Sequence, residues 1–439
     1  MYQSEEIAPV SQKARIQSID TLRGIALLGV LLMNIIAFAN PFAAYYIPSI
    51  DEADTGVNLA VFMFMDIFVE GSMRTIFSML FGAGLLIFID KPSVEAKTIK
   101  VLFYRRTLLL TGFGLFNSYV LLWLGDILYA YGMTGLILYW FRDLPARRLA
   151  GISAGIILLL SLLHSANYMY SAELGGAARA VQALPASTAR SSVQEEALQD
   201  WEDFLNQQYV GAELAEQQLQ LMQSGYIDNF LGIIPVNLFL QTTGFVGYTF
   251  WDALAMMLLG MALFKWGLLD CSRTARVYRA IALVGLCIGL PVNTWETLAF
   301  VNSGFHFEWA ALNRPTYDLG RLFLALGYVG LIMLICKIGV FKKMQRLLAK
   351  VGQMALTNYL SHSLICNFIF MGWGLGLAGT LQRIEIYYLV LGIWIFQIIT
   401  SSLWLTYFRF GPAEWAWRSL TYKKRQPFGL TRNAKASCR

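Results

Sequence analysis

Three polar side chains mark the first long apolar segment of the chain: Asp20, Arg23 and Asn34. Asp20 and Arg23 are three residues apart, so they share one face of a helix. Asn34 lies eleven residues beyond Arg23, about three turns of 3.6 residues, and continues that face. Polar groups in hydrocarbon are unfavourable unless they have partners. The stripe therefore predicts that these three residues bind substrate in a protein-lined or hydrated cavity.

Two residues are the candidates for proton transfer in catalysis, His362 and Asp126. Asn358 precedes His362 by one helical turn, so an amide and an imidazole share a face, and Asn358 is a candidate substrate ligand. The histidine is suited to general-base catalysis, and the alternative is a structural histidine bonded to a neighbouring helix. Asp126 is expected in a tight outer turn between two apolar segments.

Arg74 opens another apolar segment and is a candidate ligand for an anionic group of the substrate. The alternative is a structural ion pair with another charge at membrane depth. No metal is expected, because the three histidines are isolated from one another and the five cysteines have no paired spacing.

The composition indicates a membrane protein. Of the 439 residues, 57% are hydrophobic and 14% are charged, and the mean hydropathy is +0.53. Soluble domains are about 25% charged. Apolar runs of about 18–20 residues recur along the chain, which is the length that a bilayer core requires. The net charge of +6 does not indicate nucleic-acid binding, because the positive residues lie in loops beside these runs.

The apolar runs predict an all-α, polytopic membrane helical bundle of ten transmembrane helices. They lie at 20–40, 72–90, 103–122, 127–141, 150–170, 247–267, 279–299, 318–338, 351–371 and 386–406. If both termini are cytoplasmic, most of the 34 Lys and Arg residues fall in inner segments and only four in outer loops. The positive-inside rule therefore predicts a multi-pass protein of the bacterial cytoplasmic (inner) membrane with both termini in the cytoplasm.

Two apolar segments are poor transmembrane candidates, 57–70 and 227–243, because they are short or carry several polar residues. We expect them to be re-entrant or interfacial helices on the outer side. A similar glycine-containing sequence follows each of them, beginning at Met79 and at Met257. This repetition hints at an internal duplication, as in many membrane carriers.

The predicted organisation has four parts: an N-terminal membrane bundle of five spans (1–170), an external polar helical insert (171–226), a C-terminal membrane bundle of five spans (227–422) and a basic cytoplasmic tail (423–439). The insert is expected to be a solvated cap, and the alternative is a lid that gates substrate entry.

Several sequence blocks resemble the YeiB-like family of bacterial inner-membrane proteins, whose function is unknown. The N-terminal blocks are Ser18-Ile-Asp-Thr-Leu-Arg-Gly with Asn34, Phe77-Ser-Met-Leu-Phe-Gly-Ala-Gly and Trp123-Leu-Gly-Asp-Ile-Leu. The C-terminal blocks are more specific: Gly352-Gln-Met-Ala-Leu-Thr-Asn-Tyr, Phe408-Arg-Phe-Gly-Pro-Ala-Glu-Trp and Trp417-Arg-Ser-Leu-Thr-Tyr. The resemblance covers most of the chain apart from the insert.

This family is distantly related to membrane acyltransferases such as the heparan-alpha-glucosaminide N-acetyltransferase. The resemblance implies that acyl-CoA or acetyl-CoA enters from the cytoplasm as the donor. Those transferases use a histidine shortly after the first span, and residues 35–56 contain none. Either His362 or a carboxylate replaces it, or the chain is not an acyltransferase.

The leading expectation is thus a membrane acyltransferase-like protein that moves an acyl group to a small, saccharide or lipid acceptor. The rival is a transporter or exporter of a small metabolite or lipid precursor, and a sensor or scaffold without turnover is a third option. The expected partners are the lipid bilayer and a small-molecule substrate, with no nucleic acid; whether the protein forms a homodimer stays open.

Overall fold

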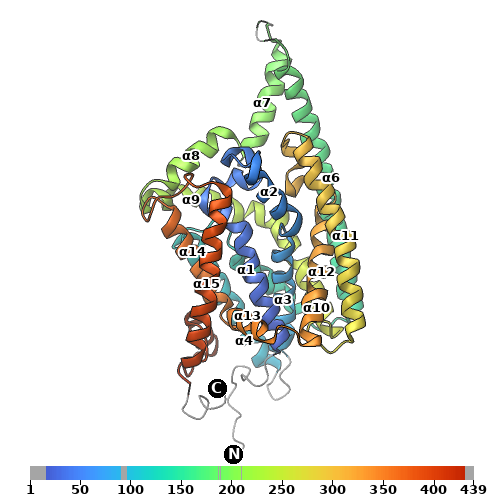
Figure 1. Ribbon diagram of the computed structural model, residues 1–439, viewed down its shortest axis with the longest axis vertical. Helices are drawn as coiled ribbons and strands as arrows, with labels where there is room; N and C mark the ends of the chain where they lie inside the picture. Colours follow the sequence, from blue (N-terminus) through green and yellow to red (C-terminus); the bar gives the residue numbers. More distant parts are fainter. Residues whose placement is uncertain (1–15, 90–95, 186, 188, 209, 431–439) are drawn as a thin grey trace, which may run out of the picture.

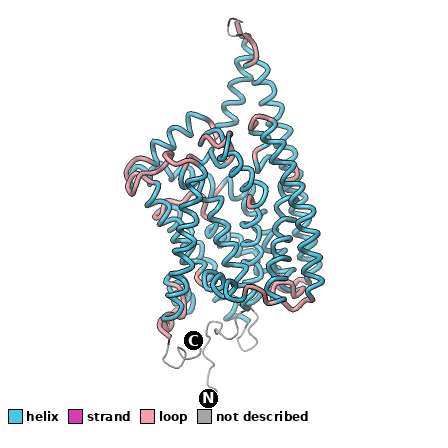
Figure 2. The backbone as a smooth tube through the Cα atoms, in the orientation of Figure 1, coloured by secondary structure: helices cyan, strands magenta, loops and turns pink. Residues whose placement is uncertain are grey.

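The computed structural model describes residues 16–89, 96–185, 187, 189–208 and 210–430. Within these ranges the chain is helical, and its sole β-type pairing is one isolated bridge between Phe408 and Gly429 (Figure 2). The predicted all-α membrane bundle is confirmed. The predictions for the chain start, for the inner loop around 91–95 and for the tail beyond 430 lie outside the described residues.

The α-helices are α1 (Gln17–Ala39), α2 (Gly56–Phe68), α3 (Ser72–Ile89), α4 (Ala96–Tyr119), α5 (Ile127–Leu138), α6 (Ala146–Gln182), α7 (Ser192–Gln207), α8 (Ala212–Met222), α9 (Tyr226–Gln241), α10 (Phe250–Lys265), α11 (Ala275–Asn302), α12 (Tyr317–Ile338), α13 (Lys342–Gln353), α14 (Ala355–Phe370), α15 (Arg383–Tyr407) and α16 (Pro412–Tyr422). Short 3₁₀ helices are η2 (Phe42–Tyr45), η3 (Pro48–Asp51), η4 (Tyr139–Phe141), η6 (Phe307–Trp309) and η7 (Ala311–Asn313), and η5 (Phe245–Thr249) is a π-helix.

Seven helical segments among the described residues are long and apolar enough to cross a membrane. They are Gln17–Ala39, Gly56–Ile89, Ala146–Gln182, Tyr226–Lys265, Ala275–Asn302, Tyr317–Ile338 and Arg383–Tyr407. The other three predicted spans coincide with helices α4, α5 and α14. α5 with η4 forms a shorter apolar helix, Ile127–Phe141. The predicted span at 351–371 began too early, because the chain breaks at Met354 between the amphipathic α13 and α14.

The two segments expected to be re-entrant or interfacial form helices that lead directly into spans. α2 precedes α3, and α9 precedes α10 through η5, so each pair is one long helical segment with an interruption. α3 and α10 then cross at two glycines. A Cβ at Gly82 would collide with the carbonyl oxygen of Met257, and one at Gly260 would collide with the carbonyl oxygen of Met79. This reciprocal contact brings the two similar sequences together.

α1 lies inside the bundle and packs against α3, α13, α14 and α15 (Figure 1). Its closest approach is to α13. A Cβ at Gly24 would collide with the carbonyl oxygen of Leu348, and one at Gly352 would collide with that of Asp20. The absence of both side chains lets the backbones touch, and this contact fixes Asp20 and Arg23 beside the start of α14.

The insert forms a projection and a cap at one end of the bundle. α6 continues past the predicted span to Gln182 and pairs with α7 in a hairpin that extends beyond the other helices (Figure 1). α8 lies closer to the bundle: Gln218 accepts a hydrogen bond from the backbone N–H of Phe42 at 2.8 Å, and Met222 accepts one from that of Gly372 at 2.8 Å. The predicted boundary at residue 170 falls inside α6.

Candidate functional site

A pocket of about 260 Å³ lies where the start of α1 meets the end of α16, since Ile16 and Tyr422 both line it. We call it the inner pocket. Its other walls come from α3, α4, α5 and the start of α14. The lining is mostly aliphatic and aromatic. The residues are Ile16, Ile19, Asp20, Arg23, Phe77, Leu80, Phe81, Gly84, Leu85, Ile87, Phe88, Phe103, Arg106, Thr107, Leu110, Leu128, Tyr131, Gly352, Gln353, Ala355, Leu356, Tyr359, Glu414, Trp417, Arg418 and Tyr422.

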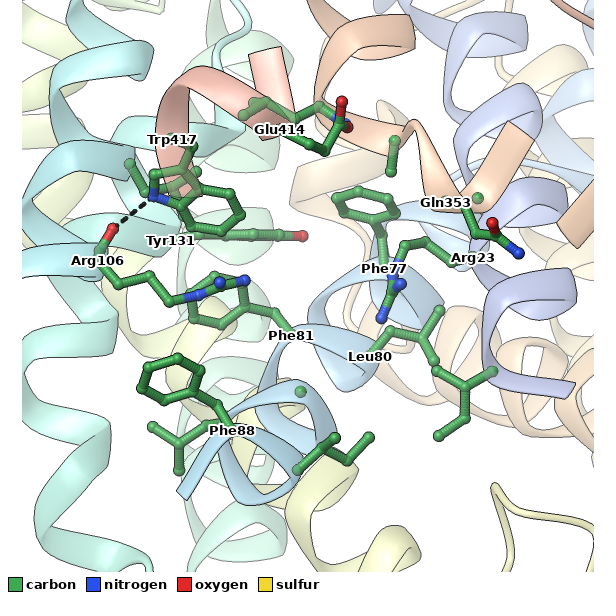
Figure 3. A pocket seen from close by; sticks show the side chains of 18 of the residues that line it. Arg23, Phe77, Leu80, Phe81, Phe88, Arg106, Tyr131, Gln353, Glu414 and Trp417 are labelled. Carbon is green, nitrogen blue, oxygen red and sulfur yellow. Dashed lines mark hydrogen bonds between the residues drawn. The ribbon is translucent and has the colours of Figure 1, made fainter. Parts of the chain in front are cut away.

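Three arginines, Arg23, Arg106 and Arg418, line the inner pocket together with two carboxylates, Asp20 and Glu414. Figure 3 shows the guanidinium groups of Arg23 and Arg106 on opposite sides of the pocket, both directed into it. Arg106 interacts electrostatically with both other arginines. The three guanidinium groups outnumber the two carboxylates, and an anionic group between the arginines would relieve their mutual repulsion. The pocket therefore suits an amphiphile with an anionic head.

Arg23 forms an ion pair with Asp20, at 2.9 Å between Nη1 and Oδ1. The two residues share one face of α1, as their spacing predicted, and both line the inner pocket. The Arg23 side chain is about a quarter exposed, whereas that of Asp20 is buried. The carboxylate thus holds the guanidinium at the pocket wall and leaves part of it accessible to a ligand.

The wall opposite α1 is built around Arg106 on α4. Its guanidinium stacks on the indole of Trp417, 3.7 Å from the ring centroid, and lies 5.2 Å from the ring of Phe88. The indole N–H of Trp417 donates to the backbone oxygen of Arg106 at 2.8 Å (Figure 3). These contacts hold the guanidinium in one orientation between two aromatic rings.

Glu414 joins α16 to the start of α14. Its carboxylate accepts hydrogen bonds from the backbone N–H groups of Leu356 and Thr357 at 2.6 and 3.1 Å, and from the hydroxyl of Thr357 at 2.5 Å. Burial raises the pKa of Glu414, and the hydrogen bonds from Thr357 oppose that shift. The carboxylate therefore caps α14 and holds α16 as one wall of the pocket.

The pocket extends along α4 from Arg106 toward the turn that joins α4 to α5, where Tyr359 lines it. The hydroxyl of Tyr359 accepts a hydrogen bond from the backbone N–H of Ile127 at 3.1 Å and donates one to the backbone oxygen of Gly125 at 3.5 Å, so it lies next to Asp126. Asp126 does not itself line the pocket. It lies directly behind Tyr359.

Asp126 is the N-cap of α5. One carboxylate oxygen accepts from the backbone N–H of Tyr129 and the other from the side-chain amide of Asn117, both at 2.8 Å. Loss of hydration in the bundle raises the pKa of Asp126 to about 7, although these hydrogen bonds stabilise its ionised form. A carboxyl group with this pKa exchanges a proton readily near neutral pH.

A second polar group facing the pocket is the hydroxyl of Tyr131 on α5. It lies 2.5 Å from the Ser78 hydroxyl, and Ser78 in turn donates to the backbone oxygen of Arg74 at 3.0 Å. This hydroxyl pair connects the pocket to a separate buried network of charges on α3, α10 and α12.

Arg74 belongs to that network and does not line the inner pocket. Its guanidinium lies 3.8 Å from the carboxylate of Asp252 and donates to the hydroxyl of Tyr317 at 3.4 Å. Arg321 bridges Asp252 and Asp318, with 2.6 Å between its Nη2 and the Asp318 carboxylate. Such buried ion pairs are the structural alternative that the sequence left open for Arg74.

The remaining candidates lie elsewhere. His362 and Asn358 are buried between α14 and α15: His362 Nε2 is 2.9 Å from Gln397 Oε1, and the Asn358 amide donates to Ser401 at 3.0 Å. Asn34 is half-buried on α1. None of these three residues lines the inner pocket. In the described chain, no cluster of three or more His, Cys, Asp or Glu side chains has a metal-binding arrangement.

Several pocket residues carry no signal in the sequence. Arg106, Tyr131 and Thr107 lie within predicted spans and have no local spacing signal. A signal did exist for the C-terminal wall, because the C-terminal blocks that carry the family resemblance supply about a third of the lining. These pocket residues are Gly352, Gln353, Ala355, Leu356, Tyr359, Glu414, Trp417, Arg418 and Tyr422.

Comparison with known proteins agrees with this resemblance. Residues 263–424 match the family described as "Protein of unknown function (DUF418)". The chain is 30% identical over 418 residues to the uncharacterized protein YeiB of Escherichia coli (strain K12), which covers 93% of this chain and 97% of YeiB. It is 26% identical over 431 residues to the uncharacterized protein YxaH of Bacillus subtilis (strain 168), with 96% and 98% covered. The chain therefore belongs to the YeiB-like family of membrane proteins.

Proposed function

We propose that this protein is a membrane acyltransferase that takes an acyl-CoA or acetyl-CoA donor into the inner pocket and passes the acyl group to an acceptor. One observation carries the proposal. A single pocket joins a cluster of three arginines to Tyr359, behind which lies Asp126. One end of this apolar cavity would bind the anionic head of the donor. The other end would supply the groups that accept a proton.

The arginines match the phosphate groups of such a donor. Guanidinium groups bind phosphate oxygens through two parallel N–H bonds, and Arg23 and Arg106 approach the pocket from opposite sides. The aliphatic and aromatic lining suits the less polar arm that carries the acyl group. The ring stacking of Arg106 lowers the entropy lost when it binds phosphate.

Asp126 and Tyr359 would supply the proton transfer. The acceptor's oxygen or nitrogen attacks the thioester carbonyl while its proton moves to the Tyr359 oxygen and the Tyr359 proton moves to Asp126. The carbon–sulfur bond then breaks, and the thiolate leaves with a proton returned along the same path. A carboxyl group that titrates near neutral pH serves both directions of this transfer.

The orientation that fits this proposal places the arginine cluster at the cytoplasmic face of the bacterial inner membrane. The basic inner segments support it through the positive-inside rule. The start of α1 and the end of α16 line one pocket, so these two parts of the chain lie at the same end of the bundle. Both chain ends would then face the cytoplasm.

The direct test is donor binding and turnover by the purified full-length protein in detergent. Titration with acetyl-CoA and longer acyl-CoA thioesters should show saturable binding, and a thiol reagent should detect free CoA once an acceptor is supplied. A negative result would be the absence of binding by any thioester in a sample whose thermal unfolding is cooperative. Binding that persists in Arg23→Gln/Arg106→Gln protein would also contradict the proposed site.

A second candidate function is transport of an anionic amphiphile. The observation that favours it is the duplicated pair of interrupted helices, α2–α3 and α9–α10, which cross through Gly82 and Gly260. Secondary transporters commonly build their substrate sites from interrupted helices in corresponding positions. Proteoliposomes loaded with a fluorescent single-chain phospholipid distinguish the two functions, because a transporter moves it across the bilayer without releasing a thiol.

A further inference from the structure

Two cysteines lie near each other at the end of the bundle that holds the start of α1, which lines the inner pocket. Cys271 lies in the loop between α10 and α11, and Cys336 lies in the last turn of α12. Two residues before Cys271, the backbone oxygen of Leu269 accepts a hydrogen bond from the hydroxyl of Ser18 at 3.0 Å. The loop that carries Cys271 therefore contacts the first turn of α1 next to Asp20.

The contacts of the loop hold the Cys271 sulfur against α12. It lies 3.8 Å from the backbone oxygen of Met333 and 3.9 Å from the Met333 sulfur. Cys336 is three residues beyond Met333, so both face the loop from the same side of α12. The Lys337 ammonium donates to the backbone oxygen of Cys271 at 2.9 Å and fastens the loop there. The side chains of Cys271 and Cys336 are therefore neighbours at this contact between the loop and α12.

The pair also has the chemistry of a reactive thiol. The neighbouring Cys336 thiol lowers the pKa of Cys271 to about 7, against the opposite effect of burial. The thiolate is the nucleophilic form of cysteine. Cys271 and Cys336 are both partly exposed, so a small oxidant reaches them. Of the other described cysteines, Cys366 is buried and Cys287 is exposed on α11.

We propose that Cys271 and Cys336 are an oxidation site that closes to a reversible disulfide on exposure to hydrogen peroxide. The Cys271 thiolate attacks a peroxide oxygen, the O–O bond breaks, and a sulfenic acid and water form once a proton is taken up. The Cys336 sulfur then attacks the Cys271 sulfur, the S–OH bond breaks, and a second water leaves. Two thiols and one peroxide give one disulfide and two waters, and a dithiol reductant reverses the change.

The bridge would fasten the α10–α11 loop to α12. Because the same loop holds the start of α1 through the Ser18–Leu269 hydrogen bond, oxidation would stiffen the wall of the inner pocket that the start of α1 forms. This oxidation does not depend on the function of the pocket, because it changes the two thiols alone.

The test uses full-length protein in detergent, with Cys438 replaced by serine because that residue lies outside the described chain. Reduced protein is treated with hydrogen peroxide, alkylated with N-ethylmaleimide and digested for mass spectrometry. The expected product is one peptide pair joined through Cys271 and Cys336, which disappears after reduction. Cys287→Ser protein, the matched control, should give the same bridge with the same yield.

Single variants then separate the two steps. Cys336→Ser should leave a sulfenic acid on Cys271 that dimedone traps, and Cys271→Ser should leave Cys336 alkylatable after peroxide. If a variant fails to fold, the wild-type protein still tests the proposal, because its Cys271 should react with N-ethylmaleimide faster than its Cys366. The proposal is overturned if peroxide leaves both thiols free, or if Cys271 oxidises in the wild type without joining Cys336.

Discussion

Arg74 and Asp252 hold corresponding positions in the two interrupted helical segments, and their side chains approach each other to 3.8 Å. Each lies eight residues before a crossing glycine, Arg74 before Gly82 and Asp252 before Gly260. The carbonyl contacts at these glycines are reciprocal, so an approximate twofold relation places the two residues opposite each other. In one segment this position is a cation and in the other it is an anion, which makes the pair complementary.

The crossing of α3 and α10 gives a first prediction. Gly260→Ala should lower the free energy of unfolding by about 1–3 kcal/mol, because the new methyl group meets the Met79 carbonyl and forces the helices apart. Thermal unfolding in detergent measures the change. Gly84→Ala is the control, since a Cβ at Gly84 meets no atom within 4 Å and should be neutral or stabilising. Equal effects of the two substitutions would show that the crossing does not need glycine.

The arginine cluster gives a second prediction. Arg106→Gln should weaken acyl-CoA binding by about 1.5–3 kcal/mol, roughly 10- to 100-fold in Kd, because a charge-assisted contact to phosphate is lost. Isothermal titration at several salt concentrations measures this, and the variant should also show a shallower salt dependence. Lys100→Gln is the matched control: Lys100 lies on the same helix but stacks over Trp140 away from the pocket. A comparable loss of acyl-CoA affinity in Lys100→Gln would show that the affinity depends on net charge alone and not on the position of Arg106.

The proton acceptor gives a third prediction. If ionised Asp126 accepts the proton through Tyr359, kcat/KM should rise with pH through about 7 and level off above it. Asp126→Asn retains an N-cap for α5 and should abolish both the rate and its pH dependence. Tyr359→Phe should cause a similar loss of rate. If kcat/KM of Asp126→Asn depended on pH as in the wild type, another residue would be the general base.

The third prediction also covers stability, because the pKa of Asp126 determines how stability depends on pH. Its pKa in the folded protein, about 7, is higher than the ordinary value of 3.8. The folded state therefore holds this proton more tightly, and the stability that it contributes is complete below about pH 4 and disappears as the pH rises through 7. Thermal unfolding of wild type and Asp126→Asn between pH 5 and 8, in about one-unit steps, should show a smaller decline with pH in the variant. Parallel curves would contradict the shifted pKa.

His362 gives a fourth, contrasting prediction. Because its imidazole bonds to Gln397 between α14 and α15 and does not reach the pocket, His362→Leu should lower stability by about 1–3 kcal/mol while acyl transfer persists. Activity per folded molecule is the measurement, with the folded fraction taken from gel filtration. Loss of turnover in a well-folded variant would restore His362 as a catalytic residue.

The buried ionic network gives a fifth prediction. Arg321→Met should cost about 3–5 kcal/mol, because it leaves the carboxylates of Asp252 and Asp318 without their shared partner. The comparison is Arg142→Met, which removes a pair with the exposed Asp143 and should change stability by less than about 1 kcal/mol. Similar losses of stability in Arg321→Met and Arg142→Met would mean that water solvates the charges of the network.

The sequence by itself determined that the chain is an all-α bundle of apolar helices and that Asp20 and Arg23 share one face of α1. Apolar runs of bilayer length leave little choice of structure, because every backbone polar group in hydrocarbon must be bonded within its own helix. The spacing of Asp20 and Arg23 likewise fixes their common face, since helix periodicity is local. The similarity of the two glycine-containing segments was also visible before their contact was known.

Only the tertiary structure decided which residues share the inner pocket. Arg106 on α4 meets Trp417 on α16, and Tyr359 on α14 meets Asp126 before α5, across long separations in sequence. A helical pattern gives the relative positions of residues on one helix, but not the rotation of that helix toward its neighbours. That rotation depends on close contacts such as the one between Gly24 and Leu348. For this reason His362 and Asp126, equal candidates in the sequence, have different surroundings in the fold.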